Sequence, residues 1–104
     1  MISILLTDAF VDWRDSLGDG KAKAAIARRI DRLAAGNPGY VKVLGDGVSE
    51  MRIDYAPGYR LYVMRRGAML IVLLCGGDKS TQTRDVARAK RIARSWSEEK
   101  EDER

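Results

Sequence analysis

The stretch Ser49–Gln82, SEMRIDYAPGYRLYVMRRGAMLIVLLCGGDKSTQ, decides the fold of this chain. Val48–Tyr55 alternates between apolar and polar residues, and Tyr59–Arg66 does the same, which predicts two half-buried strands. Ala68–Cys75 is apolar throughout, so we expect a central strand that is covered on both faces. The stretch therefore predicts two β-hairpins in series, followed by a polar loop and a helix that begins near Ser80–Thr83.

Glycine and proline mark the turns of these hairpins. Ala56-Pro57-Gly58 separates the first two strands, and Arg66-Gly67 separates the second from the third. The alternation between the turns assigns side chains to the two faces of the sheet. One face is predicted to be apolar and to carry Met51, Ile53, Leu61 and Val63. The other is predicted to carry Arg52, Arg60 and Tyr62.

The register of these strands is strongly specified, because a shift by one residue would move the arginines into the core. Lys42 joins the basic face if Val41 and Val43 take the inner side of their own strand. A sheet face with several arginines and lysines is a surface that binds anions, and nucleic acid is a common large anion for a small basic protein.

Shorter elements precede this stretch. Strands are predicted at Ile2–Leu6 and Val41–Leu44, and helices from Thr7 or Asp8 to Ser16 and over Lys21–Ala35. The order β-α-α-β-β-β-β-α predicts an α+β domain with an antiparallel sheet, an N-terminal helical hairpin on its apolar face and a C-terminal helix. We expect one domain over residues 1–96 and a polar, frayed tail over 97–104.

Composition narrows the functional classes. The 104 residues carry a formal charge of +4, and residues 41–94 hold eleven Lys and Arg against five acidic residues. Such a surface can also serve solubility alone. There is no histidine, so zinc sites and histidine-based catalysis are excluded, and no metal or cofactor is expected. Cys75 has no disulfide partner, and no signal peptide or membrane span is evident, so we expect a cytoplasmic protein.

RNA cleavage through the 2′-hydroxyl is one reaction that a basic face can support. It needs a base for the 2′ proton, cations for the phosphate and an acid for the 5′ oxygen. Lys79 is the first candidate for proton transfer, since lysine can replace histidine where its neighbours favour the neutral amine, and Lys42 is the second. Arg52 and Arg60 suit a phosphate clamp.

Other residues have more than one interpretation. Tyr62 can stack on a base, donate a proton or pack within the sheet. Glu50 can orient Arg52 or act as a base. Arg52 and Arg60 can also form cross-strand ion pairs with Glu50 or Asp54 on a solvated face. Further cations predicted to contact RNA are Arg65, Arg84 and Arg88, although the last two also fit an ordinary solvated helix face.

The chain also resembles a known superfamily. The segments LGDGVSEMRIDYAPGYRLYV (Leu44–Val63) and LLCGGDKSTQ (Leu73–Gln82) are similar to the RelE/ParE toxins of bacterial toxin–antitoxin pairs, in the HigB-like, phage-derived branch. The resemblance implies a RelE-like fold and a ribosome-dependent messenger RNA endonuclease. By motif position it also implies Arg52, Arg60 and Lys79 as functional residues, with Lys42 as a weaker match.

The resemblance also implies partners. These are a small antitoxin, typically a helix-turn-helix DNA-binding protein, the ribosome with its message, and operator DNA reached through the antitoxin. The chain lacks the C-terminal Tyr or His that several relatives place in the site, and its only aromatic residue there is Trp96. Two alternatives therefore stay open: a ParE-like toxin that binds gyrase without catalysis, and a degenerate toxin that retains only antitoxin binding.

Overall fold

The computed structural model describes residues 2–55 and 58–102, and its elements follow the predicted order β-α-α-β-β-β-β-α. The predicted turn at Ala56-Pro57-Gly58 lies outside the described residues at its first two positions. The strands are β1 (Ser3–Leu6), β2 (Val41–Gly45), β3 (Val48–Arg52), β4 (Tyr59–Arg66) and β5 (Leu70–Asp78). The helical elements are α1 (Asp8–Ser16), α2 (Gly20–Ala34), the 3-10 turn η1 (Lys79–Thr81) and α3 (Gln82–Asp102).

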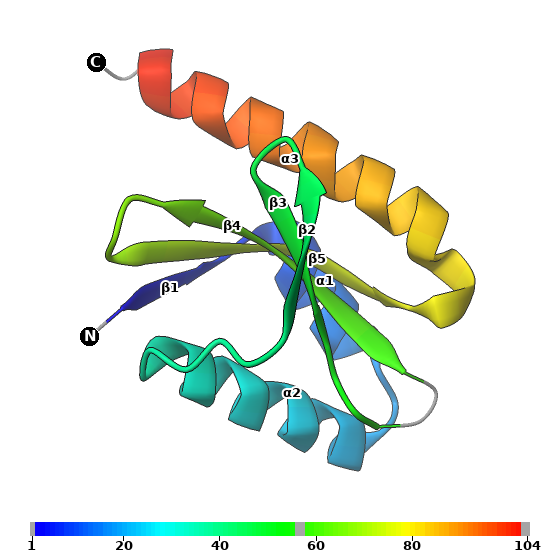
Figure 1. The fold of residues 1–104 in the computed structure, drawn as a ribbon. Helices are drawn as coiled ribbons and strands as arrows, with labels where there is room; N and C mark the ends of the chain where they lie inside the picture. Colours follow the sequence, from blue (N-terminus) through cyan, green and yellow to red (C-terminus); the bar gives the residue numbers. More distant parts are fainter. Residues whose placement is uncertain (1, 56–57, 103–104) are drawn as a thin grey trace.

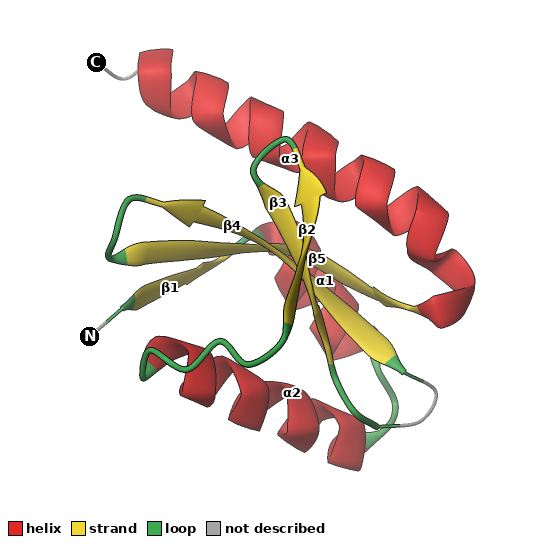
Figure 2. Cartoon of the chain, in the orientation of Figure 1, coloured by secondary structure: helices red, strands yellow, loops and turns green. Residues whose placement is uncertain are grey.

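The five strands form one sheet in the order β1-β5-β4-β3-β2, and α2 and α3 lie on opposite sides of it (Figure 1). The strands from β2 to β5 form an antiparallel meander, as predicted. β1 pairs with β5 in the parallel direction. A parallel pair requires a long connection between its two strands, and the chain from α1 to β4 supplies it. The result is an α+β domain with helices on both faces of a mostly antiparallel sheet (Figure 2).

Side-chain caps begin the first two helices and fasten them to the sheet. Thr7 Oγ1 accepts the N–H of Phe10 and donates to the carbonyl of Leu74 at 2.6 Å, so the cap of α1 is also tied to β5. Asp19 accepts two backbone N–H groups from the first turn of α2. The Tyr55 hydroxyl donates to the second oxygen of Asp19 at 3.0 Å, which connects the start of α2 to the chain beyond β3.

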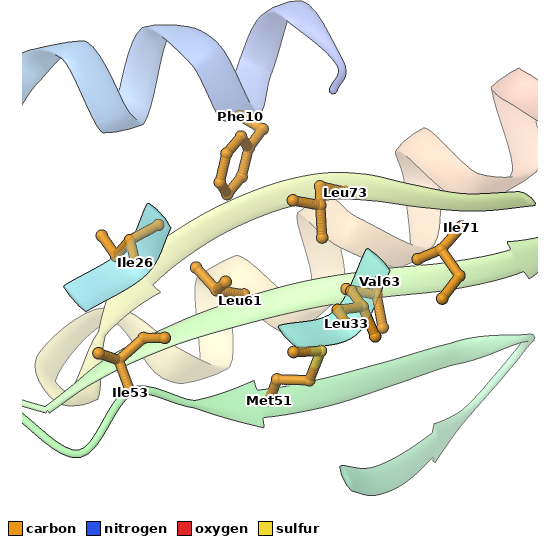
Figure 3. Packing of buried hydrophobic residues seen from close by; sticks show 9 residues of the cluster. All are labelled: Phe10, Ile26, Leu33, Met51, Ile53, Leu61, Val63, Ile71 and Leu73. Atoms are coloured by element: carbon orange, nitrogen blue, oxygen red, sulfur yellow. The ribbon is translucent and has the colours of Figure 1, made fainter. Parts of the chain in front are cut away.

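The helical hairpin covers the predicted apolar face of the sheet. Nine buried side chains form this core, shown in Figure 3: Phe10, Ile26, Leu33, Met51, Ile53, Leu61, Val63, Ile71 and Leu73. Phe10 points from α1 toward the sheet, while Ile26 and Leu33 come from α2 (Figure 3). The assignment of the four predicted strand residues to this face is therefore confirmed. Val43 is different, because β2 is an edge strand and leaves this side chain exposed rather than on the inner side.

The opposite face is closed by α3 instead of being open to solvent along its length. The second core holds Val48, Tyr62, Met64, Val72, Leu74 and Cys75 from the sheet, with Ala89 and Ala93 from α3. The apolar stripe of α3 needs an apolar surface to pack on, and the middle of this face supplies it. Only the ends of β3 and β4, with Arg52 and Arg60, lie beside the start of the helix. The expectation that β5 is covered on both faces is confirmed.

A β-bulge in β5 sets the geometry near its end. Tyr62 pairs with Cys75 and Val63 with Leu73, so Leu74 is the extra residue of β5. Gly76 and Gly77 follow, and each lies against a bulky group. A Cβ on Gly76 would collide with the Trp13 ring, and one on Gly77 would collide with the Asp85 carboxylate. Glycine at both positions is thus a packing requirement of the two faces.

α3 is the longest element and continues through Asp102, into the segment 97–104 that the sequence assigned to a polar tail. Its packed part begins at η1, where Asp78 caps the turn by accepting the N–H of Ser80 at 2.8 Å. Arg66 lies over the Trp96 ring, with its guanidinium carbon 5.1 Å from the ring centre. This contact fixes α3 near the β4–β5 turn, at the end of the sheet opposite to η1.

Candidate functional site

An open groove of about 1180 Å³ lies between α2 and the end of the sheet where β3 finishes, β4 starts and β5 finishes. Its lining holds six cations from three separate parts of the chain: Arg28, Arg29, Arg32, Arg52, Arg60 and Lys79. Asp31 and Asp54 are the acidic residues of the lining, and Tyr40, Tyr55 and Tyr59 are its aromatic residues. A concave surface with this excess of positive charge attracts anions.

A buried carboxylate positions the two sheet arginines of the groove. Arg52 and Arg60 face each other across β3 and β4. Arg60 Nε lies 3.3 Å from Glu50 Oε1, where the Arg60 side chain is 9% exposed and the Glu50 side chain is fully buried. The contact is an ion pair without hydrogen-bond geometry. Arg52 Nε lies 3.8 Å from Glu50 Oε2 and keeps 57% of its side chain exposed.

These contacts decide between the two interpretations of Glu50. The carboxylate is enclosed and already in contact with both arginines, so it orients them and has no access to a substrate proton. The predicted cross-strand ion pair with Glu50 is confirmed for Arg60, whereas Arg52 contacts Glu50 within the same strand, β3. Because an arginine fork has several donors, pairing one edge with Glu50 leaves the rest of each guanidinium available to the groove.

The same carboxylate also reaches the start of α3. Gln82 Nε2 donates to Glu50 Oε1 at 3.0 Å. Gln82 follows η1 directly, so this bond ties the loop that carries Lys79 to the strands that carry the arginines. Lys79 is exposed and lines the groove. The three residues predicted as the catalytic group, Arg52, Arg60 and Lys79, therefore line one groove, and Glu50 contacts the two arginines.

The loop before α3 is fixed by short polar contacts. Asp78 Oδ1 accepts from both the N–H and the Oγ of Ser80, and these bonds hold the pKa of the Asp78 carboxyl below its usual value. Thr81 hydrogen-bonds to the buried Asp85, whose other oxygen lies 3.8 Å from Arg84 Nε. Asp78 is the N-cap of η1 and forms a capping box with Thr81.

Tyr62 does not belong to the groove, and the prediction that it contacts RNA or donates a proton is wrong in this structure. Its side chain is fully buried in the core under α3, opposite Glu50 in the neighbouring strand. Burial first, and the charges of Glu50 and Asp85 next, raise the pKa of the Tyr62 hydroxyl far above its usual value. The third interpretation, packing within the sheet, is the one that the structure supports.

The remaining predicted cations are dispersed. Lys42 is exposed on β2 opposite Glu50, outside the lining of the groove. Arg65 lies five residues beyond Arg60 along β4, roughly 16 Å away in an extended strand, and donates to the carbonyl of Ala68. Arg84 and Arg88 are exposed on α3, also outside the lining. A single cluster of all the predicted cations is therefore not formed.

Sequence reasoning missed the contribution of α2. Arg28, Arg29 and Arg32 line the groove, and no role was assigned to them from the sequence. Arg29 is buried, as are Ile26 three residues before it and Leu33 four residues after it. That spacing places Arg29 on the buried stripe itself, and this was the signal available in the sequence. Burying a charge is unfavourable unless it is paired, so a cation on a buried helix stripe indicates an ion pair or a functional role.

Two other features bear on possible chemistry. Among the side chains that the structure describes, in residues 2–55 and 58–96, no group of three or more His, Cys, Asp or Glu is arranged to hold a metal ion. Burial raises the pKa of the Cys75 thiol to about 11, so this group is protonated and enclosed at neutral pH.

No helix in the described part of the chain has the length and apolar character needed to cross a membrane.

Comparisons with known proteins give one family and one curated relative. The family model described as "Phage derived protein Gp49-like (DUF891)" matches residues 12–96. An uncharacterized protein of Haemophilus influenzae is 47% identical over 92 residues, which cover 88% of this chain and 93% of that protein. The match to the family model includes α2, the strands of the groove and the start of α3.

Proposed function

The chain belongs to the phage-derived Gp49-like family, which is associated with toxins of toxin–antitoxin addiction modules, and from this premise we propose that it is a toxin that cleaves messenger RNA. The observation that carries the proposal is the lining of one groove by Arg52, Arg60 and Lys79, with the buried Glu50 in contact with the two arginines. Two guanidinium groups paired with one carboxylate, with an exposed amine in the same groove, suit a phosphodiester better than a neutral ligand.

The proposed reaction is the attack of the 2′-hydroxyl oxygen on the adjacent phosphorus. A bond forms between the 2′ oxygen and phosphorus, and the bond from phosphorus to the 5′ oxygen breaks. The products are a 2′,3′-cyclic phosphate and a free 5′-hydroxyl. Arg52 and Arg60 bind the non-bridging oxygens, whose charge grows in the transition state.

Proton transfer is assigned to Lys79 and to solvent. Arginine stays charged and cannot take a proton, and Glu50 and Tyr62 are enclosed. We therefore assign removal of the 2′ proton to Lys79, while water supplies a proton to the 5′ oxygen. The open face of the groove suits a substrate that is presented by a larger assembly, which fits action on the translating ribosome.

The partners of this proposal are a cognate antitoxin, the ribosome and its message, and operator DNA through the antitoxin. The family association supports an antitoxin, and the basic groove supports RNA. We propose a helix-turn-helix protein as the antitoxin on the resemblance to HigB-like systems. The protein would act in the cytoplasm, where translation takes place.

The test is expression of this chain alone in bacteria, with mapping of cellular RNA 5′ ends. The variant Arg52→Ala/Lys79→Ala removes two exposed groups, so its fold should persist. Arg91→Ala/Arg94→Ala is the matched control, because it removes the same charge from exposed positions of α3 outside the groove. We expect growth arrest and new ends within translated messages for the parent chain and the control, and neither for the groove variant.

Other outcomes would point elsewhere. Arrest without new RNA ends would contradict the ribonuclease proposal and would favour a gyrase-binding toxin. An absence of arrest, with the folded protein present, would indicate a degenerate toxin. Arrest with new ends that the groove variant retains would show that cleavage does not depend on Arg52 and Lys79.

A further inference from the structure

The groove has a second basic wall that the proposed reaction does not use. Arg28 and Arg32 are exposed on α2, with the buried Arg29 between them. Tyr40, which precedes β2, is 70% exposed and lines the same groove. This wall faces the groove from α2 and the loop after it, whereas Arg52, Arg60 and Lys79 belong to the sheet and η1.

Arg29 is a buried cation without an anion. Its residue exposure is 6%, and its one hydrogen bond runs from Nη2 to the Tyr40 carbonyl at 3.3 Å. None of the acidic side chains in the described part of the chain lies within ion-pair distance of it. Burial first, and the charge of Arg32 next, lower the pKa of the Arg29 guanidinium. An anion in the groove would relieve both unfavourable effects.

The loop after α2 is shaped around this guanidinium. Gly39 has a φ of +64°, and a Cβ there would lie 3.0 Å from Arg29 Nη2. This backbone conformation and the lack of space beside Arg29 both favour glycine at this position. Its closure brings the Tyr40 carbonyl to Arg29 and leaves the Tyr40 ring exposed at the groove.

We propose that the α2 wall is a second nucleotide subsite, in which Arg28, Arg29 and Arg32 bind a further phosphate of the RNA strand and Tyr40 stacks on a base. The inference rests on the proposed function for the identity of the ligand, which is single-stranded RNA. Aromatic rings at a basic groove are the usual means of holding single strands. The groove volume of about 1180 Å³ exceeds the range of roughly 300–1,000 Å³ that is typical for small-molecule sites.

The test measures binding separately from cleavage. The probe is a short single-stranded 2′-O-methyl oligoribonucleotide, which cannot be cut because its 2′ oxygen is blocked. Its affinity is measured at several salt concentrations for the parent chain, for Arg28→Ala/Arg32→Ala and for Arg91→Ala/Arg94→Ala. Both variants lose two exposed charges, one pair inside the groove and one outside it. Their helical content and unfolding midpoint confirm that each is folded.

We expect the salt slope of log K to fall in magnitude by about 0.7 for each phosphate contact that is lost, hence by about 0.7 in the α2 variant, which loses the one further phosphate. The α3 variant should keep the parent slope. Tyr40→Ala should weaken binding by at least about fivefold. Val43→Ala, which truncates an exposed apolar residue of the adjacent β2 outside the groove, should leave it unchanged.

Equal slopes in the two double variants would overturn the subsite, and so would a parent chain that does not bind the probe. If the α2 variant binds RNA normally but is no longer neutralised by the antitoxin, the wall serves a protein partner and the proposal is wrong. Failure of the proposed catalysis is distinguishable from these results. If only the catalysis failed, the α2 variant would still show a smaller salt slope than the parent chain, while an unmodified RNA would stay uncut.

Discussion

The two faces of the sheet are both closed by helices, but they are built from different chemistry. The face under α1 and α2 is covered by a core of nine apolar side chains. The face under α3 adjoins buried polar groups, among them Glu50, Arg60 and Asp85, and three buried atoms, Glu50 Oε2, Arg60 Nε and the Tyr62 hydroxyl, have no hydrogen-bond partner among the described residues. Unmatched buried polar atoms reduce stability. The first face therefore maintains the fold, and the second gives up stability to hold the groove arginines in place.

The largest effect that separates the faces should come from Glu50→Ala. Removal of the carboxylate leaves Arg60 as a buried cation without its partner, which typically costs about 3–5 kcal/mol in the free energy of unfolding. It also frees Gln82, so the Lys79 loop loses its connection to the strands. We expect urea denaturation to show this loss, and RNA cleavage to fall even under conditions where the variant is folded.

Arg52→Ala is the matched control for Glu50. It removes the exposed partner of the same carboxylate, so the unfolding free energy should change by less than about 1 kcal/mol while cleavage is lost. Equal destabilisation by the two changes would show that Glu50 does not serve Arg60 in particular. Full activity of a folded Glu50 variant would show that the arginines need no buried anchor.

Phe10→Ala should give the opposite pattern on the first face. Phe10 is fully buried and packs against Trp13 with ring centres 5.8 Å apart. Its truncation should lower the unfolding free energy by about 3–5 kcal/mol, yet cleavage per folded molecule should stay near the parent value at low temperature. Met69→Ala, at an exposed position, should change neither the unfolding free energy nor cleavage. A specific loss of activity in folded Phe10→Ala would break the division between the faces.

The alternation in β3 and β4 was sufficient to predict which residues face the helical hairpin. Period-two patterns are local, and a shift by one residue would have exposed Met51 and Leu61 while burying charge. Tyr62 shows where the same pattern fails. Alternation placed Tyr62 correctly on the second face. Only the packing of α3, however, determines that this part of the face is buried while Arg52 remains exposed.

The candidate site was predictable only in part for a related reason. Arg52, Arg60 and Lys79 lie near the ends of consecutive elements, so their meeting could be inferred from strand order. The approach of α2 to the same groove depends on how the helical hairpin crosses the sheet, which no local pattern encodes. The bulge at Leu74 is similar, because it arises from the pairing of two strands and reassigns the faces of Gly76 and Gly77.

Gly77→Ala should have an intermediate effect. Gly77 pairs with Arg60 across β4 and β5, and its missing side chain makes room for the Asp85 carboxylate. A methyl group there must displace Asp85 from Thr81, and overpacking of this kind costs about 1–3 kcal/mol. Gly20→Ala is the control, because nothing lies within 4 Å of its Cβ position and alanine favours the first turn of α2. The thermal unfolding midpoint of Gly77→Ala should lie below that of the parent chain, and the midpoint of Gly20→Ala should lie at or above it.

The smallest effect is expected from Tyr62→Phe. The hydroxyl is buried and has no hydrogen-bond partner, so its removal leaves the packing of the ring intact and eliminates an unsatisfied group. The unfolding free energy should change by less than about 1 kcal/mol, and a small increase would also agree with this argument. Cleavage should be unchanged, because the ring is closed off from the groove by the strands and α3. A large loss of cleavage with unchanged stability would mean that the hydroxyl reaches the substrate. The second face would then be part of the reacting surface rather than its support.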